Sequence, residues 1–261
     1  MYKAIFFDID GTILSFKTHE VPDSTRQALN ELRKKGIKLF LATGRMPVVM
    51  EPIVNILNFD FDGYIYANGQ YVVIGDEVIH DLALPNDELK KLIPYLEEKK
   101  IATEFSEMKY RYANFTNDRM IKLKGILGST VKMPNLDNPY ERSDNRTYQL
   151  AAYIYEDEEE EFFSIAPNMR AVRWTSLFAD IIPKAGGKSV GIQKVLEHLG
   201  MSRDECMAFG DGGNDTEMLD YVGLGIAMGN AVDSAKAVAD YITDDVDSDG
   251  IHNALKHFGM I

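Results

Sequence analysis

The sequence has a single cysteine, no long apolar segment and no excess of basic residues. With only Cys206 among 261 residues, an intramolecular disulfide is excluded, and a lone thiol fits a reducing compartment. No run approaches the ~18 consecutive apolar residues that a membrane-spanning helix needs. The short apolar run near the start is interrupted by Asp8, so we expect no signal peptide. These absences predict a cytoplasmic protein.

Acidic residues outnumber basic ones, 41 to 28, and the formal net charge is -13. Nucleic acids and anionic membrane surfaces are bound by basic faces, so we expect neither as a partner. Hydrophobic residues make up 45% of the chain, enough to bury a large core in one large domain or two smaller ones. The composition leaves the oligomeric state open and is compatible with a monomer.

Strand-like and helix-like stretches alternate in the first and last thirds of the chain. Apolar runs at 3–7 and 37–45 predict buried strands, and the patterns at 23–35 and 48–57 predict helices. Asn68-Gly69, between two apolar runs, predicts a β-hairpin. The last third repeats this alternation, with helices expected at 189–199, 216–222, 231–240 and 252–258 and strands at 206–210, 224–229 and 241–243. Such alternation predicts an α/β fold with a doubly wound parallel sheet, to which residues 1–84 and 184–261 both contribute.

The middle of the chain, residues 85–183, has a different pattern. A helix is expected at 86–100, and short strands that no helices separate are expected at 101–106, 110–115, 147–155, 169–174 and 178–183. This pattern predicts an α+β unit of about a hundred residues, a normal size for a domain. The acidic run 156–161 predicts a solvated helix start rather than a metal site. We interpret 85–183 as a domain inserted into the doubly wound domain.

Two carboxylates, Asp8 and Asp10, end the first apolar strand. Side chains two residues apart on a strand point to the same face, and ligands of open parallel sheets bind beyond the carboxyl ends of the strands. Burying carboxylates without a partner is costly, but a hard cation such as Mg²⁺ takes oxygen ligands. The two acids therefore predict a metal site at this sheet edge.

The other predicted core strands end in groups that suit a phosphoryl ligand. These groups are a hydroxyl, a backbone amide, a lysine that opens a helix, two further acids and a side-chain amide. In that order they belong to Thr43, Gly44, Lys188, Asp211, Asp215 and Asn214. A metal and a lysine neutralise phosphoryl oxygens, while amides and a hydroxyl orient them. A carboxylate can attack phosphorus to give an aspartyl-phosphate, and a second acid can protonate the leaving oxygen and then activate water.

These residues resemble, in order, the four motifs of the haloacid dehalogenase (HAD) superfamily phosphatases: DIDGT from Asp8, ATGR with Thr43, Lys188, and GDGGND from Asp211. The last motif and the large α+β insert resemble the Cof-type branch, whose members are mostly sugar-phosphate phosphatases. The resemblance implies a Rossmann-like core with an inserted α+β cap and a Mg²⁺ cofactor. It implies Asp8 as nucleophile and metal ligand and Asp10 as acid/base, with its backbone carbonyl on the metal. It also implies phosphate binding by Thr43, Gly44, Lys188 and Asn214, and metal binding by Asp211 and Asp215.

Substrate selection is expected from the insert, because the core motifs engage only the phosphoryl group. We predict Arg111 or Arg173 as a substrate contact, and period-2 alternation allows only one of each adjacent pair on a strand to face the site. Asn214, with Glu217 three residues later, also predicts a helix N-cap.

Three functions are compatible with this set of residues. The first is a Mg²⁺-dependent phosphatase of a small phosphorylated metabolite, with a sugar phosphate favoured. A phosphosugar mutase of the same superfamily would use the same core motifs. A receiver-like signalling module also uses an aspartate, Mg²⁺, a lysine and a hydroxyl, although it needs neither Asp10 nor the insert.

Overall fold

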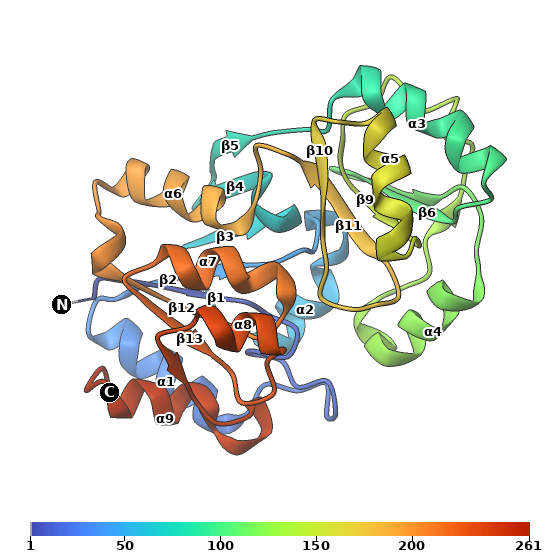
Figure 1. Cartoon of the computed structure of the whole chain (residues 1–261). Helices are drawn as coiled ribbons and strands as arrows, with labels where there is room; N and C mark the ends of the chain where they lie inside the picture. The colour runs from blue at the N-terminus through green and yellow to red at the C-terminus, as the bar shows by residue number, and fades with distance from the viewer. Residues whose placement is uncertain (1) are drawn as a thin grey trace.

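The computed structural model describes residues 2–261, within which the strands form an eight-stranded and a six-stranded sheet (Figure 1). We call these the core sheet and the cap sheet. All core-sheet strands come from 4–81 and 206–242, and all cap-sheet strands from 103–183. The strands thus fall on either side of the predicted boundaries at 84/85 and 183/184, although the division into domains itself stays a prediction.

The core sheet has the strand order β14-β13-β12-β1-β2-β3-β4-β5. The first six run parallel, and β4 and β5 add an antiparallel edge. The strands are β1 (Ala4–Phe7), β2 (Lys38–Ala42), β3 (Gly63–Tyr66), β4 (Tyr71–Ile74), β5 (Glu77–Asp81), β12 (Cys206–Gly210), β13 (Leu224–Ala227) and β14 (Tyr241–Ile242). Because β1 lies between β12 and β2, residues from both ends of the sequence meet at the centre of the sheet.

Helices cover both faces of the core sheet (Figure 1). On one face, α1 packs on α9, and Arg26 of α1 donates to the last carbonyls of α2; on the other, α6, α7 and α8 lie side by side. Their bounds are α1 Asp23–Lys34, α2 Glu51–Leu57, α6 Lys188–Leu199, α7 Thr216–Tyr221, α8 Asp233–Val238 and α9 Gly250–His257. The predicted doubly wound α/β core is confirmed.

The central strands are buried on both faces, which explains their unbroken apolar sequences. All four residues of β1 and all five of β12 are buried. Rings from neighbouring strands stack on each other, Phe6 on Phe40 and Phe7 on Phe209. Cys206, the lone thiol, is buried in β12, and burial raises its pKa to about 11. Burial thus favours the thiol over the thiolate, which is the reactive form of cysteine.

The cap sheet has the order β10-β11-β9-β6-β7-β8 and is antiparallel except for the β7–β8 pair. Apolar residues of α3 and α5 pack on one face of it, while α4 belongs to a separate apolar cluster with Tyr153 and Phe178. The bounds are α3 Asn86–Glu98, β6 Thr103–Glu107, β7 Arg111–Ala113, α4 Asp118–Leu127, β8 Asn135–Leu136, β9 Thr147–Ala152, α5 Glu159–Ile165, β10 Met169–Val172 and β11 Ala179–Pro183. The predicted α+β cap is confirmed.

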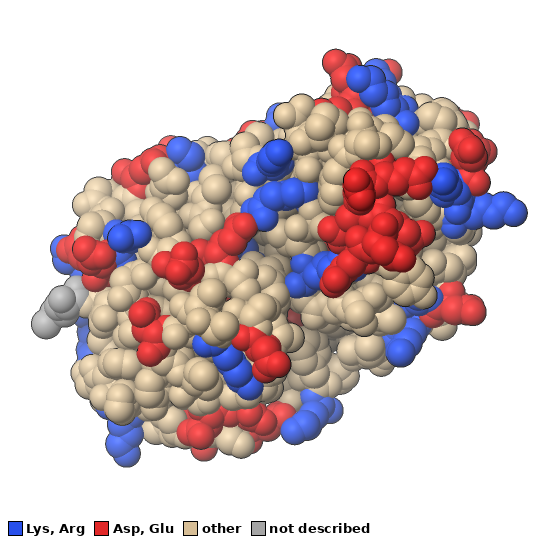
Figure 2. All heavy atoms as spheres, viewed as in Figure 1, with Lys and Arg blue, Asp and Glu red and all other residues tan. Residues whose placement is uncertain are grey.

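Local details test the sequence-based expectations. β3 and β4 form the predicted hairpin, with Asn68 in the left-handed region at φ 54°. The acidic run 156–161 forms a short 3₁₀ turn and the first residues of α5, and acidic side chains gather there on the surface (Figure 2). The sequence did not predict β5 and β8, because both are edge strands with exposed residues and no apolar run. Within residues 2–261, no helix is both long and apolar enough to cross a membrane.

Candidate active site

The predicted site residues lie where three adjacent core strands end. Asp8 follows β1, Thr43 follows β2 and Asp211 follows β12, and these strands are neighbours in the sheet. The backbone of Asp8 continues the ladder by donating to the carbonyl of Phe209, and the amide of Thr43 donates to Ile65. The sheet order thus brings residues about 170 to 200 positions apart to one edge.

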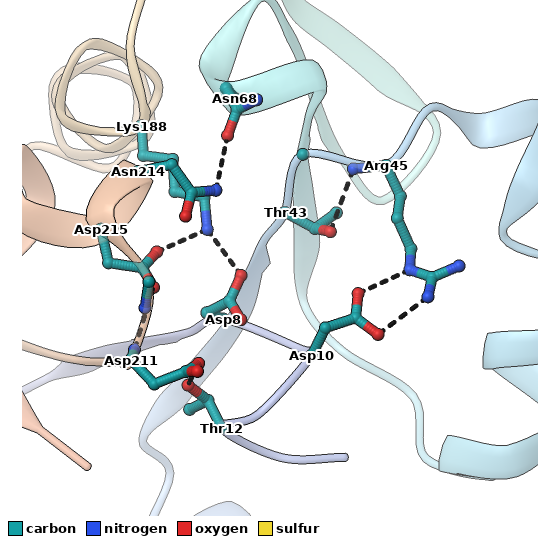
Figure 3. A network of polar contacts seen from close by, with 12 residues as sticks. Asp8, Asp10, Thr12, Thr43, Arg45, Asn68, Lys188, Asp211, Asn214 and Asp215 are labelled. Atoms are coloured by element: carbon teal, nitrogen blue, oxygen red, sulfur yellow. Dashed lines mark hydrogen bonds and ion pairs between the residues drawn. The ribbon is translucent and has the colours of Figure 1, made fainter. Parts of the chain in front are cut away.

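Lys188, the first residue of α6, is 1% exposed and lies between two acids (Figure 3). Its Nζ donates to Asp8 Oδ1 and to Asp215 Oδ1, both at 2.6 Å. The second oxygen of Asp215 accepts from the backbone amides of Asp211 and Gly212. Asp215 is thereby held by three donors, and Lys188 is aimed directly at the predicted nucleophile.

Burial and mutual repulsion disfavour the ionised forms of these acids. Burial raises the pKa of Asp8 to about 7, with Lys188 opposing the shift and Asp215 adding to it. Burial, followed by the charge of Asp8, raises the pKa of Asp211 well above its usual value. Burial would lower the pKa of Lys188, but the charges of Asp215 and Asp8 outweigh it and raise the pKa. One buried cation therefore leaves the acidic cluster incompletely neutralised.

Asp8, Asp211 and Asp215 can each offer a carboxylate oxygen such that the three oxygens lie within 4.8 Å of one another. Thr12 Oγ1 donates to Asp211 Oδ1 at 2.8 Å and orients that carboxylate. Gly11, at φ 95°, allows the chain to pass this close, because a Cβ there would lie 2.2 Å from Asp211 Oδ2. An all-oxygen set of buried acids with incomplete charge balance fits a hard divalent cation.

The carboxylate of Asp10 points away from this cluster (Figure 3). Both of its oxygens accept from Arg45, at 2.7 Å from Nε and 2.8 Å from Nη2. Burial would lower the pKa of Arg45, but the charge of Asp10 outweighs it and raises the pKa. The predicted acid/base is therefore separated from the predicted nucleophile and held by a residue whose role the sequence did not reveal.

The predicted phosphate-binding groups surround the same edge. Thr43 is 1% exposed, and its hydroxyl accepts from the backbone amide of Arg45. Gly44 lines a cavity between the core edge and the cap sheet, and its carbonyl accepts from Gln149 of β9. Asn214 donates to Asn68 at 2.9 Å. Thr43, Gly44, Lys188 and Asn214 thus lie around Asp8, but their binding of phosphate stays a prediction.

The predicted N-cap at Asn214 and Glu217 is wrong. The Asn214 side chain turns to Asn68, and Glu217 forms a bidentate ion pair with Arg170 of β10. Asp215 accepts the backbone amides at this turn instead. Contacts with partners distant in the sequence have replaced the local pattern.

A cavity lies between the core edge and the cap sheet. Its core side includes Asp8, Asp10, Thr43 and Arg45, and its polar cap side includes Glu104, Arg111, Gln149 and Asp180. Apolar side chains of α4 and the rings of Trp174 and Phe178 also line it. The cavity extends from the predicted phosphate-binding residues to a region with both polar and apolar walls, as expected for binding the rest of a substrate.

The structure places the two predicted substrate contacts differently. Arg111 lines the cavity and pairs with Glu104 at 3.0 Å, while its neighbour Tyr112 packs inside the cap. Arg173 lies outside the lining of this cavity and is paired with Glu159, while its neighbour Trp174 lines it. The expected alternation holds for Arg111 and Tyr112 of β7, whereas Arg173 and Trp174 follow the end of β10 and are not on a strand. The geometry favours Arg111 as the contact.

Asn68 and Asp180 join the core to the cap above the site and were not among the predicted residues. Asp180 Oδ2 accepts from Asn68, and Asp180 Oδ1 accepts from Gln149. Burial raises the pKa of Asp180 to about 7, with the Asn68 hydrogen bond opposing the shift and Glu104 adding to it. Asn68 carried only a turn signal in the sequence, and Asp180 lies in an apolar strand.

The comparisons with known proteins agree with this geometry. A family described as haloacid dehalogenase-like hydrolase matches residues 5–255. The chain belongs to this family. The Bacillus subtilis protein YkrA, which bears the name of a phosphatase, is 37% identical over 259 residues, covering 99% of this chain and 98% of its own.

Solved structures extend this family assignment. The HAD subclass IIB sugar phosphatase BT4131 has a TM-score of 0.91 at 39% identity, covering 99% of this chain and all of its own. The HAD phosphatase BT1666 from Bacteroides thetaiotaomicron has a TM-score of 0.89 at 33% identity, covering all of this chain and 96% of its own. The predicted resemblance to Cof-type HAD phosphatases is confirmed, and so is the assignment as a hydrolase. A receiver-like module is thereby disfavoured.

Proposed function

We propose that this protein is a Mg²⁺-dependent phosphatase that hydrolyses a small phosphorylated metabolite, most suitably a sugar phosphate, through an aspartyl-phosphate on Asp8. The observation that carries the proposal is the position of Asp8. Its buried carboxylate lies 2.6 Å from Lys188 Nζ and faces the cavity between the core edge and the cap sheet. The sugar phosphatase BT4131, among the similar structures, supports the substrate class. The cytoplasmic location remains a prediction.

In the first step, an oxygen of Asp8 attacks phosphorus, the ester P–O bond breaks, and Asp10 gives a proton to the leaving oxygen. In the second step, water attacks the same phosphorus and gives a proton to Asp10. The bond between phosphorus and Asp8 then breaks, releasing inorganic phosphate. One pair of acids serves both steps, and each step balances in protons.

The remaining residues bind and orient the phosphoryl group. Lys188 would neutralise its oxygens, while Thr43, Gly44 and Asn214 would hold them in line for attack. Asp8, Asp211, Asp215 and the backbone carbonyl of Asp10 would hold Mg²⁺. When bound, the ion would supply positive charge next to the phosphoryl oxygens and reduce the repulsion between them and the acids.

Phosphate release from a panel of phosphorylated metabolites tests the proposal. With Mg²⁺ present, we expect turnover of at least one hexose or pentose phosphate. Exhaustive chelation should lower the rate more than about 100-fold, because the acids of the cluster would repel each other and the substrate. Restoring Mg²⁺ should restore the rate. Full activity in the chelated enzyme would contradict the metal requirement, and isomer interconversion without phosphate release would indicate a mutase.

Arg111→Ala tests the substrate contact. We expect kcat/KM for the best sugar phosphate to fall about 10- to 100-fold, mainly through KM, because a charged hydrogen bond to the sugar is lost. The kcat/KM for 4-nitrophenyl phosphate, which lacks sugar hydroxyls, should change little. Lys90→Ala removes an exposed ion pair elsewhere on the cap and serves as the control. The same two assays on Arg173→Ala test the second predicted contact. Equal losses on both substrates in Arg111→Ala would rule out a contact between Arg111 and the sugar.

A further inference from the structure

The guanidinium of Arg45 lies between the predicted acid/base and the cap. On one side it donates twice to Asp10, from Nε and Nη2. On the other side Nη1 donates to the carbonyl of Thr130 at 3.0 Å, and Nη2 to its hydroxyl at 3.2 Å. Asp10 and Arg45 belong to the loops after β1 and β2, whereas Thr130 ends the 3₁₀ turn Gly128–Thr130 after α4. One side chain therefore joins the two parts of the chain at the acid/base.

Each partner in this contact is held in place. Arg45 is 8% exposed, so few solvent molecules compete for its donors. The hydroxyl of Thr130 donates to the carbonyl of Leu127 at 2.6 Å, which orients its oxygen to accept from Arg45. The Asp10 side chain, in contrast, is 21% exposed and could rotate if it were released. The planar fork of the guanidinium thus restricts the orientation of the carboxylate.

We propose that Arg45 is a positioning residue: it orients the carboxylate of Asp10 and makes that orientation depend on the cap through Thr130. This inference rests on the proposed function, because it concerns the acid of the proposed first step. A positioned acid contributes about 10²- to 10⁴-fold in rate, and a misplacement near 1 Å can remove much of it. The enzyme would then protonate the leaving group efficiently only when residues 128–130 lie over the site.

Two other arginines join the cap to the core without touching Asp10. Arg146 forms a bidentate pair with Asp81 of β5, and Arg170 forms one with Glu217 of α7. The Arg146 side chain is 60% exposed, and neither of the two residues lines the cavity. Arg146→Lys therefore weakens a bridge between the same two parts while leaving the acid/base in place. It is a matched control for Arg45→Lys.

The first test compares leaving groups in single-turnover formation of the phosphoenzyme. The probes are 4-nitrophenyl phosphate, whose leaving group needs no proton, and the hexose 6-phosphate hydrolysed fastest, whose alkoxide needs one. Arg45→Lys keeps the charge but loses the fork, so we expect a loss of about 10- to 100-fold on the alkyl ester and less than about 3-fold on the nitrophenyl ester. Arg146→Lys should change neither rate more than about 2-fold. Equal losses on both esters in Arg45→Lys would overturn the inference.

The second test asks whether Arg45 acts through Asp10. Asp10→Asn alone should cost about 10²- to 10⁴-fold on the alkyl ester. Adding Arg45→Lys to Asp10→Asn should cost less than about 2-fold more, because the group that Arg45 positions is already disabled. If the two losses multiply, Arg45 acts elsewhere, on the phosphoryl group or on the fold, and the inference fails.

Thr130→Val tests the link to the cap. It removes the hydroxyl contact with Arg45 but leaves the carbonyl contact. We therefore expect the rate on the alkyl ester to fall about 3- to 10-fold relative to the rate on the nitrophenyl ester, a smaller loss than in Arg45→Lys. An unchanged ratio of the two rates would show that the orientation of Asp10 does not depend on the contact with Thr130. Failure of the proposed function would look different, because the wild-type enzyme would then form no phosphoenzyme from either ester.

Discussion

Asp8→Asn is expected to abolish turnover while leaving the fold intact. The amide keeps the size and shape of the side chain but cannot attack phosphorus, so we expect phosphate release to fall more than about 10⁴-fold. Burial raises the pKa of Asp8 to about 7 even with Lys188 beside it, so the ionised form is costly in the folded state, and a neutral amide removes that cost while Lys188 keeps Asp215 as a partner. The melting temperature in metal-free buffer should therefore equal or exceed that of the wild type. Phosphate release and thermal unfolding of the same preparation measure both effects.

Asp220→Asn provides the control, since Asp220 is an exposed residue of α7 on the same chain. It should retain wild-type activity. Peptide mass spectrometry after rapid quenching should place the phosphoryl group on Asp8 in the wild type and on no residue of the Asp8→Asn variant. Near-normal turnover by Asp8→Asn would contradict the proposed nucleophile and, with it, the covalent mechanism.

Lys188→Met is expected to remove both activity and stability. Lys188 is the buried cation between Asp8 and Asp215, and methionine fills similar space without a charge. Removing one partner of a buried ion pair costs about 3–5 kcal/mol, because the remaining charges are left unpaired. We expect the free energy of unfolding in metal-free buffer to fall by about that amount, as measured by urea denaturation. Turnover should fall by at least about 10²-fold through lost charge stabilisation.

Mg²⁺ should reduce the stability deficit of Lys188→Met, because a bound cation would neutralise the same acids. The exposed pair of Lys194 with Glu197 gives the control, and Lys194→Met should change the free energy of unfolding by less than about 1 kcal/mol. A Lys188→Met enzyme with wild-type stability in metal-free buffer would show that the buried pair contributes nothing to the fold. A deficit unaffected by Mg²⁺ would argue against a metal at this cluster.

The arrangement explains why acids follow a buried strand. Asp8 has Lys188 as a partner, Asp10 has Arg45, and Asp211 has Thr12. Each acid is stabilised by a donor from a different segment, yet only one buried lysine faces the three acids Asp8, Asp211 and Asp215, and burial raises the pKa of Asp211 well above its usual value. A bound cation would favour the ionised acids and would also attract the oxygens of a phosphoryl group.

The strand and helix alternation, the doubly wound core and the α+β insert could all be predicted from the sequence. It also identified the groups that meet at the sheet edge, from Asp8 through Thr43 and Lys188 to Asp211. These features could be predicted because each depends on local information: apolar runs, turn residues at strand ends, and the rule that parallel strands end at a common edge. Asp8 and Asp211 meet because β1 and β12 are neighbours, and no longer-range detail is needed.

The partners of the polar side chains, in contrast, depend on how the chain packs in three dimensions. Arg45 reaches Thr130 across 85 positions, Asn68 reaches Asp180 across 112, and Asn214 turns to Asn68 across 146 instead of capping its own helix. The physical reason is that a polar side chain buried between two packed sheets must find a partner among the groups placed there, whatever their distance in the sequence. Local spacing indicates what a residue can bind, whereas the packing of the cap on the core determines which partner lies within hydrogen-bond distance.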